Sequence, residues 1–174
     1  MPEVELLVSL KIPDVTALTA ANTLRRRMGY GEVLEKLDRA DYYLFDIEAA
    51  DVDAACERVR DIAEHTTLFV NPNKHVFEVQ PWQAGASLRR EGDLYVVHCL
   101  VRSLDYDAGP GMVESLHKLG YGEVRGLQTG TLWTLHLRVR EEAAARALAE
   151  EIAVTKSRSQ GLLANPHYQT CEVL

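Results

Sequence analysis

The sequence is poor in the features that mark several classes of protein. Only three cysteines, Cys56, Cys99 and Cys171, occur in 174 residues, which excludes a disulfide framework and predicts a reducing, cytoplasmic compartment. No apolar run approaches the roughly 20 residues that span a bilayer. The acidic N-terminus also lacks the basic region of a signal peptide. We therefore expect a cytoplasmic protein that has no membrane partner.

Positive charge is scarce as well. Nineteen Lys and Arg stand against 26 Asp and Glu, for a net charge of −7. Proteins that follow nucleic-acid phosphates usually carry a basic surplus or stripe, so we expect no nucleic-acid partner. The densest basic cluster is Arg25, Arg26 and Arg27. Such a triplet is typical of a solvated helix end, where the helix dipole favours cations; contact with an acidic partner subunit is the functional alternative.

The sequence contains none of the common catalytic or metal-binding motifs. The six histidines form no HxH or HExxH pair, and the cysteines form no CxxC pair, so we expect no metal site. The glycines at 120, 122 and 126 have the wrong spacing for a dinucleotide loop and follow an expected helix. We interpret the cysteines as buried structural residues. The sequence thus predicts no catalytic residue and no bound cofactor.

What the sequence does contain is an internal repeat. The segment Gly-Tyr-Gly-Glu-Val at 29–33 recurs unchanged at 120–124. Later in each half an Asn-Pro pair is followed, after five residues, by Glu-Val; these pairs begin at Asn71 and Asn165. Two signatures in the same order and at similar spacing indicate a tandem duplication.

The duplication defines the expected organisation. We assign copy one to residues 1–80, a linker to 81–92 and copy two to 93–174. The linker mixes Pro, Gly, Ser and charge, which is typical of a connector. We interpret the pairs Asn71-Pro72 and Asn165-Pro166 as turns, and a subunit interface is the alternative role.

Hydrophobic periodicity predicts the same elements in both copies. Period-two alternation indicates a first strand, and apolar spacings of three and four indicate two helices. Between the helices we expect two strands, with turns near 38–41 and 128–130. The order is β-α-β-β-α-β twice, which is typical of a ferredoxin-like α+β sandwich. The expected helices are 17–28, 51–64 and 141–155, and the terminal strands are 76–79 and 170–173.

Apolar residues occupy both faces of the expected strands. Leu94, Val96 and Leu100 oppose one apolar face in copy two, and Tyr42 and Leu44 do so in copy one. A sheet that is apolar on both faces is covered on both. We expect the other copy, or another protein, to cover the second face, so that the two copies form a pseudo-dimer.

A set of short segments, most of them in copy two, resembles a known family. These segments are Leu116–Tyr121, Gly130–Trp133, Leu162–Pro166 and Glu172-Val173 in copy two, and Gly29-Tyr30, Asn71-Pro72 and Glu78-Val79 in copy one. In their order and spacing they resemble the PurS family, the small subunit of bacterial phosphoribosylformylglycinamidine synthase. Copy one departs from the family pattern with Arg39-Ala40 at the expected strand turn and Phe69-Val70 before Asn-Pro.

The resemblance implies a non-catalytic subunit of an ATP-dependent ligase in purine biosynthesis. Such a subunit joins a PurL-type synthetase to a PurQ-type glutaminase, and those partners use ATP, Mg and glutamine to amidate formylglycinamide ribonucleotide. Family members are normally one copy long and pair as dimers, so two copies in one chain resemble a covalent dimer. An ACT-like pair that senses a small metabolite is the alternative function. A stand-alone enzyme built at the groove between the copies is a third, which no residue cluster supports.

Overall fold

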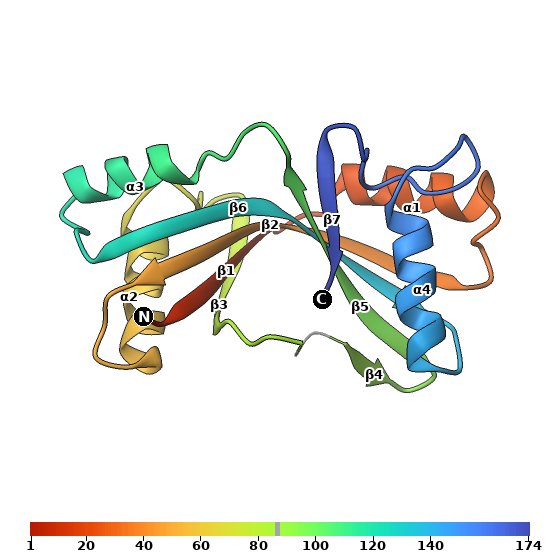
Figure 1. Ribbon diagram of the computed structural model, residues 1–174, viewed down its shortest axis with the longest axis horizontal. Coiled ribbons are helices and arrows are strands. Elements are labelled where there is room, and N and C mark those ends of the chain that lie inside the picture. The colour runs from red at the N-terminus through yellow and green to blue at the C-terminus, as the bar shows by residue number, and fades with distance from the viewer. Residues whose placement is uncertain (86–87) are drawn as a thin grey trace. The chain divides into compact units, whose positions relative to one another are not determined.

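The computed structural model describes residues 1–85 and 88–174, and they form an α+β fold of four helices and seven strands in an antiparallel sheet. The elements are β1 Glu3–Leu10, α1 Val15–Arg26, β2 Leu34–Ile47, α2 Val52–His65, β3 His75–Pro81, β4 Arg89–Glu91, β5 Leu94–Ser103, α3 Gly109–Lys118, β6 Val124–Leu137, α4 Glu142–Ala153 and β7 Gln169–Val173. The strands pair in the order β3-β1-β2-β6-β5-β4, and β7 also pairs with β5 (Figure 1).

The elements repeat along the chain in the same order. Copy one contributes β1-α1-β2-α2-β3, and copy two contributes β5-α3-β6-α4-β7. The additional residues of copy two lie between α4 and Asn165, where segment 154–164 replaces the shorter 66–70. The expected linker contains the last residue of β3 and all of β4, and its residues Ala86 and Ser87 lie outside the described residues.

The expected turns near 38–41 and 128–130 were wrong. β2 and β6 each run unbroken through 14 residues, so each copy has one long middle strand instead of two short ones. The polar residues that suggested turns find partners while extended. The Nε of Arg39 donates to the Asp14 carboxylate at 2.9 Å, and the hydroxyl of Thr129 donates to Asp107 at 2.9 Å. Polar composition alone favours a turn, but these side-chain partners stabilise a strand.

The helices of both copies end in the way that the sequence predicts. Gly29 and Gly120 have φ values of +82° and +95°, in the left-handed region that glycine enters at little cost. The next residue in each copy then donates its amide back into the helix. Tyr30 bonds to the Leu24 carbonyl at 3.1 Å, and Tyr121 bonds to the Leu116 carbonyl at 3.0 Å. The repeated segment is therefore a helix stop that positions its tyrosine.

The chain divides into two compact units whose boundaries differ from those of the sequence copies. Unit 1 combines β1, α2 and β3 of copy one with α3 of copy two, and unit 2 combines β5, α4 and β7 of copy two with α1 of copy one. In Figure 1, α2 and α3 lie near the same strands, as do α1 and α4. Unit 1 comprises Met1–Ile12, Ala40–Gln83 and Tyr106–Gly130, and unit 2 comprises Pro13–Arg39, Ala84–Asp105 and Thr131–Leu174.

Each unit has a hydrophobic core to which both copies contribute. In unit 1, Leu116 of α3 and Leu127 of β6 pack among buried residues of β1, β2 and α2. In unit 2, Leu24 of α1 and Leu37 of β2 pack among buried residues of β5, β6 and α4. Leu24 and Leu116 are fully buried. Burial of a leucine side chain contributes about 1.5–3 kcal/mol to the stability of the folded state. Each core therefore loses stability of this size without the leucine that the other copy supplies.

The second face of the strands is also buried, as the sequence predicts. Val96 and Leu100 of β5 and Tyr42 and Leu44 of β2 are all buried, while Leu94 is half-buried. The carboxylate of Glu5 is buried among them in unit 1. It accepts hydrogen bonds from the Tyr42 hydroxyl at 2.8 Å and from the Gln80 amide at 2.7 Å. A buried carboxylate is tolerated where both oxygens have such donors.

Candidate functional site

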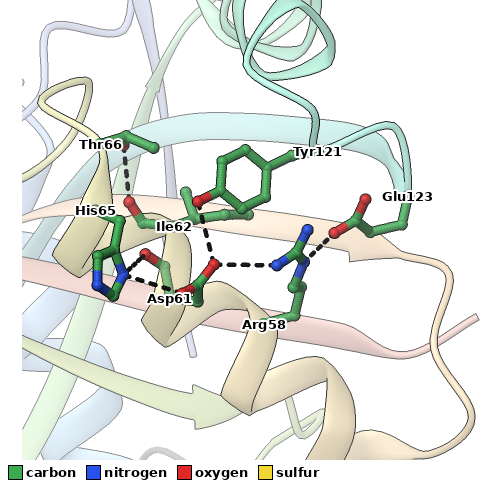
Figure 2. A network of polar contacts seen from close by, with 7 residues as sticks. All are labelled: Arg58, Asp61, Ile62, His65, Thr66, Tyr121 and Glu123. Carbon is green, nitrogen blue, oxygen red and sulfur yellow. Dashed lines mark hydrogen bonds and ion pairs between the residues drawn. The ribbon is translucent and has the colours of Figure 1, made fainter.

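The densest polar cluster of unit 1 joins α2 to the repeated segment after α3, and we call it the Arg58 network (Figure 2). The Arg58 guanidinium pairs with the carboxylates of Glu123 and Asp61, the latter at 3.0 Å. The hydroxyl of Tyr121 donates to the same Asp61 carboxylate at 3.1 Å, and the guanidinium lies 4.5 Å from the centroid of the tyrosine ring. Arg58 and Asp61 come from copy one, while Tyr121 and Glu123 come from copy two.

The electrostatics of the network favour its charged, paired form. Burial acts to raise the pKa of Glu123, but hydrogen bonds, above all that from Arg58, bring this pKa below its usual value. Burial, together with the bond to Asp61, raises the pKa of the Tyr121 hydroxyl, which stays protonated at neutral pH. A general acid or base needs a pKa near the working pH. These groups are instead fixed in the states that bind one another, so the network acts as a clamp on α2.

The end of α2 is closed by local bonds that continue the network. The Asp61 carboxylate lies 3.0 Å from the Nδ1 of His65. One residue further on, the Thr66 hydroxyl donates to the Ile62 carbonyl at 2.8 Å (Figure 2). His65 thus lies against the same Asp61 carboxylate that binds Arg58 and Tyr121.

Unit 2 builds the corresponding contact without the arginine. Tyr30, from the first copy of the repeated segment, is buried against α4 in the core of unit 2. Burial and the nearby Glu151 carboxylate raise the pKa of its hydroxyl. Leu148 holds the position on α4 that Arg58 holds on α2. The repeated tyrosine therefore packs each copy against the other in both units, and among the described residues a cation lies over the ring of Tyr121 but not over that of Tyr30.

Unit 1 also contains an open cavity of about 440 Å³ between α3 and the ends of β1, β2 and β6. Glu3 and Asp46 face each other as cross-strand neighbours in its wall, and neither has an ion-pair partner among the described residues. Arg125 is bound to Glu48, with its Nε 3.0 Å from the carboxylate. The cavity could hold a small molecule that carries an amino group. Its lining is Glu3, Leu44, Asp46, Pro110, Val113, Arg125, Gly126, Leu127 and Gln128.

The arginine triplet predicted as an interface lies at the exposed end of α1 in unit 2. Arg25 and Arg26 occupy the last helical turn, and Arg27 is the C-terminal cap. The predicted helix-end placement is confirmed. Its role in binding a partner subunit stays a prediction.

The two Asn-Pro pairs form matching exposed turns, as predicted. The Asn71 side chain accepts the Asn73 amide at 3.0 Å, and the Asn165 side chain accepts the His167 amide at 3.0 Å. Pro72 and Pro166 follow at exposed positions. Asx turns of this kind explain why asparagine precedes each bend. The alternative interface role of these four residues stays a prediction.

Cys56 and Cys99 are buried thiols whose pKa values are raised, as in structural cysteines. Burial raises the pKa of the Cys56 thiol. Contact with Cys171 and burial raise the pKa of Cys99, which is fully buried in unit 2. Protonated thiols are poor nucleophiles. Cys171, half-buried on the neighbouring strand β7, differs, because the hydrogen bond from the Cys99 thiol lowers its pKa.

Sequence reasoning missed the Arg58 network and the cavity. Tyr121 and Glu123 were visible as members of the repeat, but nothing in the spacing of α2 distinguished Arg58 from a solvated arginine. Within the described ranges, no three His, Cys, Asp or Glu side chains are grouped to hold a metal ion. None of the described helices is long and apolar enough to cross a membrane.

Comparisons with models of protein families, with curated proteins and with solved structures give no match to the chain. The likeness to the PurS family therefore rests on the sequence motifs and their order.

Proposed function

We propose that the chain is a non-catalytic, PurS-type assembly subunit of a phosphoribosylformylglycinamidine synthase, acting in the cytoplasm in purine biosynthesis. It bridges the PurL-type synthetase and PurQ-type glutaminase subunits, which bind ATP, Mg and glutamine. Each copy is a PurS-like variant of the ferredoxin-like module, in which one long strand takes the place of the two middle strands. The observation that carries the proposal is that each compact unit is assembled from both copies.

The shared cores support the idea of a covalent dimer. Leu116 of copy two completes the core of unit 1, and Leu24 of copy one completes the core of unit 2. A pair of separate one-copy chains with the same contacts would have to associate in order to fold. Joining the copies raises their effective concentration and makes the pairing intramolecular. The folded entity is then the pair, as the resemblance to a dimeric family implies.

The fixed polar groups support an assembly role over a catalytic one. Arg58, Glu123 and Tyr121 bind one another and hold α2 in place. The pKa of His98 is lowered to about 4, by burial first and by nearby positive groups second, so this imidazole is neutral at pH 7. These polar side chains thus stabilise the packing of the chain itself. The exposed helix ends and turns are free to contact partners.

Complex formation tests the proposal. The chain is mixed with purified synthetase and glutaminase subunits from the same organism, and masses are measured by size-exclusion chromatography with light scattering in the presence of ATP and glutamine. We expect one complex that contains all three chains, and no such complex when this chain is omitted. Elution of the chain alone, or equal assembly of the other two without it, would reject the proposal.

The cavity of unit 1 favours metabolite sensing, as in an ACT-like pair, as the second candidate function. Its walls come from both copies, as a ligand site between copies requires, and they carry Glu3 and Asp46, which form no ion pair with any described residue. A ligand that binds only the folded state at 100 times its Kd adds about 2.7 kcal/mol of stability. A thermal-shift screen of amino acids and nucleotides on the isolated chain tests this function. A shift that Asp46→Asn abolishes would favour it, and a flat screen would reject it.

A further inference from the structure

We infer that the outward face of α1 is the docking surface for a different protein chain, one that presents apolar side chains followed by an acidic group. This inference rests on the proposed function, since it names the part of the chain that a synthase partner contacts. We call the surface the α1 face and define it by Val15, Leu18, Asn22, Arg25 and Arg26.

The α1 face is apolar at its start and basic at its end. Val15 is 71% exposed and Leu18 is 52% exposed. Residues 15, 18, 22, 25 and 26 follow spacings of three and four, so they lie along one side of the helix. α1 contains no Asp or Glu at all, whereas α2 and α4 mix both signs of charge. A helix face that only meets water normally carries such mixed charges.

The arginines at the end of the face lack counter-ions. In the part of the chain that the structure describes, the side chains of Arg25, Arg26 and Arg27 form no ion pair or hydrogen bond. Lys118 at the corresponding end of α3 differs, because its ammonium lies 2.7 Å from Glu114. The helix dipole favours a cation by about 0.3–1 kcal/mol, but it does not require three. A cationic cluster on a chain of net charge −7 points to an acidic partner group.

Contacts at the start of α1 and on its buried side hold the α1 face in place. The Asp14 carboxylate accepts the amides of Thr16 at 2.9 Å and Ala17 at 3.2 Å, and it also binds Arg39. On the underside, Ala17 and Leu24 are buried in the core of unit 2. A surface that is ordered before binding loses little conformational entropy on binding. The face is therefore suited to bind a folded partner.

The same observations distinguish a protein from other occupants. A nucleic acid would use a longer basic track, and the exposed Val15 and Leu18 would contribute little to binding phosphates. A second copy of the chain carries the same charge of −7 and is repelled at long range. A different chain that supplies apolar contacts and a carboxylate matches both halves of the α1 face.

The test measures the affinity of the full chain for the purified synthetase and glutaminase subunits by biolayer interferometry in 50 mM and 300 mM salt. We expect Arg25→Glu with Arg26→Glu to weaken binding to one subunit by about 30-fold or more at low salt, and less at high salt, where the charges are screened. Leu18→Asp is expected to weaken the same binding by about tenfold. Lys118→Glu is the matched control and leaves affinity within about twofold. Unchanged circular dichroism shows that every variant folds.

Each other outcome overturns the inference in a distinguishable way. Wild-type binding that the α1 variants leave intact rejects the α1 face but keeps the proposed function. Absence of wild-type binding to either subunit rejects both. If a labelled 20-nucleotide DNA binds the wild type more tightly than either subunit does, and Arg25→Glu removes this binding, the occupant is a nucleic acid. If light scattering gives the wild type twice the mass of one chain, and Arg25→Glu restores the mass of a single chain, the occupant is a second copy.

Discussion

Truncating one buried leucine in each unit tests whether the units are built from both copies. Leu116 lies on α3 in copy two but is buried in unit 1, and Leu24 lies on α1 in copy one but is buried in unit 2. Both are fully buried. Leu116→Ala and Leu24→Ala therefore remove matched side chains from opposite units.

The expected loss follows from the size of the deleted group. A Leu→Ala change at a fully buried site costs about 2–5 kcal/mol, and we take about 3 kcal/mol for each variant. Since about 1.4 kcal/mol corresponds to a factor of ten, amides that exchange by opening of the affected unit should exchange roughly 100-fold faster. Hydrogen exchange followed by mass spectrometry at pH 7 measures this for each peptide. Leu18→Ala, at a half-exposed position on α1, is the control and should change exchange little.

The location of the faster exchange decides the matter. Leu116→Ala should release β1, α2 and β3, which belong to the other copy, and Leu24→Ala should release β5, α4 and β7. Two modules that each fold on their own copy would give the opposite result. Faster exchange confined to β1, α2 and β3 in Leu24→Ala would refute the shared cores.

Two further predictions concern charge. In a double-mutant cycle by urea denaturation, Arg58→Ala and Glu123→Ala should show a coupling of about 1 kcal/mol, because the pair is partly exposed; additive losses would contradict the clamp. This coupling should be present above the ordinary glutamate pKa of about 4.5 and fade as the pH falls through the lowered pKa of Glu123. His98 has a pKa of about 4 in the folded chain against about 6.5 when unfolded, so the unfolded chain binds the extra proton between these values. The stability that neutral, buried His98 provides is thus fully present above pH 6.5, and up to about 3 kcal/mol of it is lost as the pH falls towards 4. Over this range the free energy of unfolding of the wild type should fall relative to that of His98→Gln. Parallel pH profiles of the two proteins would contradict the prediction.

Local features could be predicted from the sequence because their causes are local. Gly29 and Gly120 stop helices through their own φ angles, and Asn71 and Asn165 make turns with residues two positions away. The duplication could be recognised from the matching segments alone. Burial on both faces of β5 followed from the apolar residues that occupy both faces on either side of His98.

Other features depend on partners distant in the sequence. The segment 38–41 has the composition of a turn, and partners distant in the sequence keep it extended: Asp41 pairs with Val8 of β1, and Arg39 binds Asp14. Periodicity shows which face of a helix is apolar, but not which strands that face covers. Leu24 and Leu116 therefore gave no sign that each packs with the other copy. Arg58 likewise became distinctive only when Glu123 was placed beside it.

The rate of glutamine-dependent amidation tests the proposed assembly function most directly. Purified synthetase and glutaminase subunits are assayed for conversion of formylglycinamide ribonucleotide with ATP, with and without this chain, using either glutamine or ammonium chloride as the nitrogen source. We expect the chain to raise the glutamine-driven rate by about tenfold or more, because it holds the two subunits together, and to leave the ammonium-driven rate nearly unchanged. A glutamine-driven rate that is the same without the chain would contradict the account.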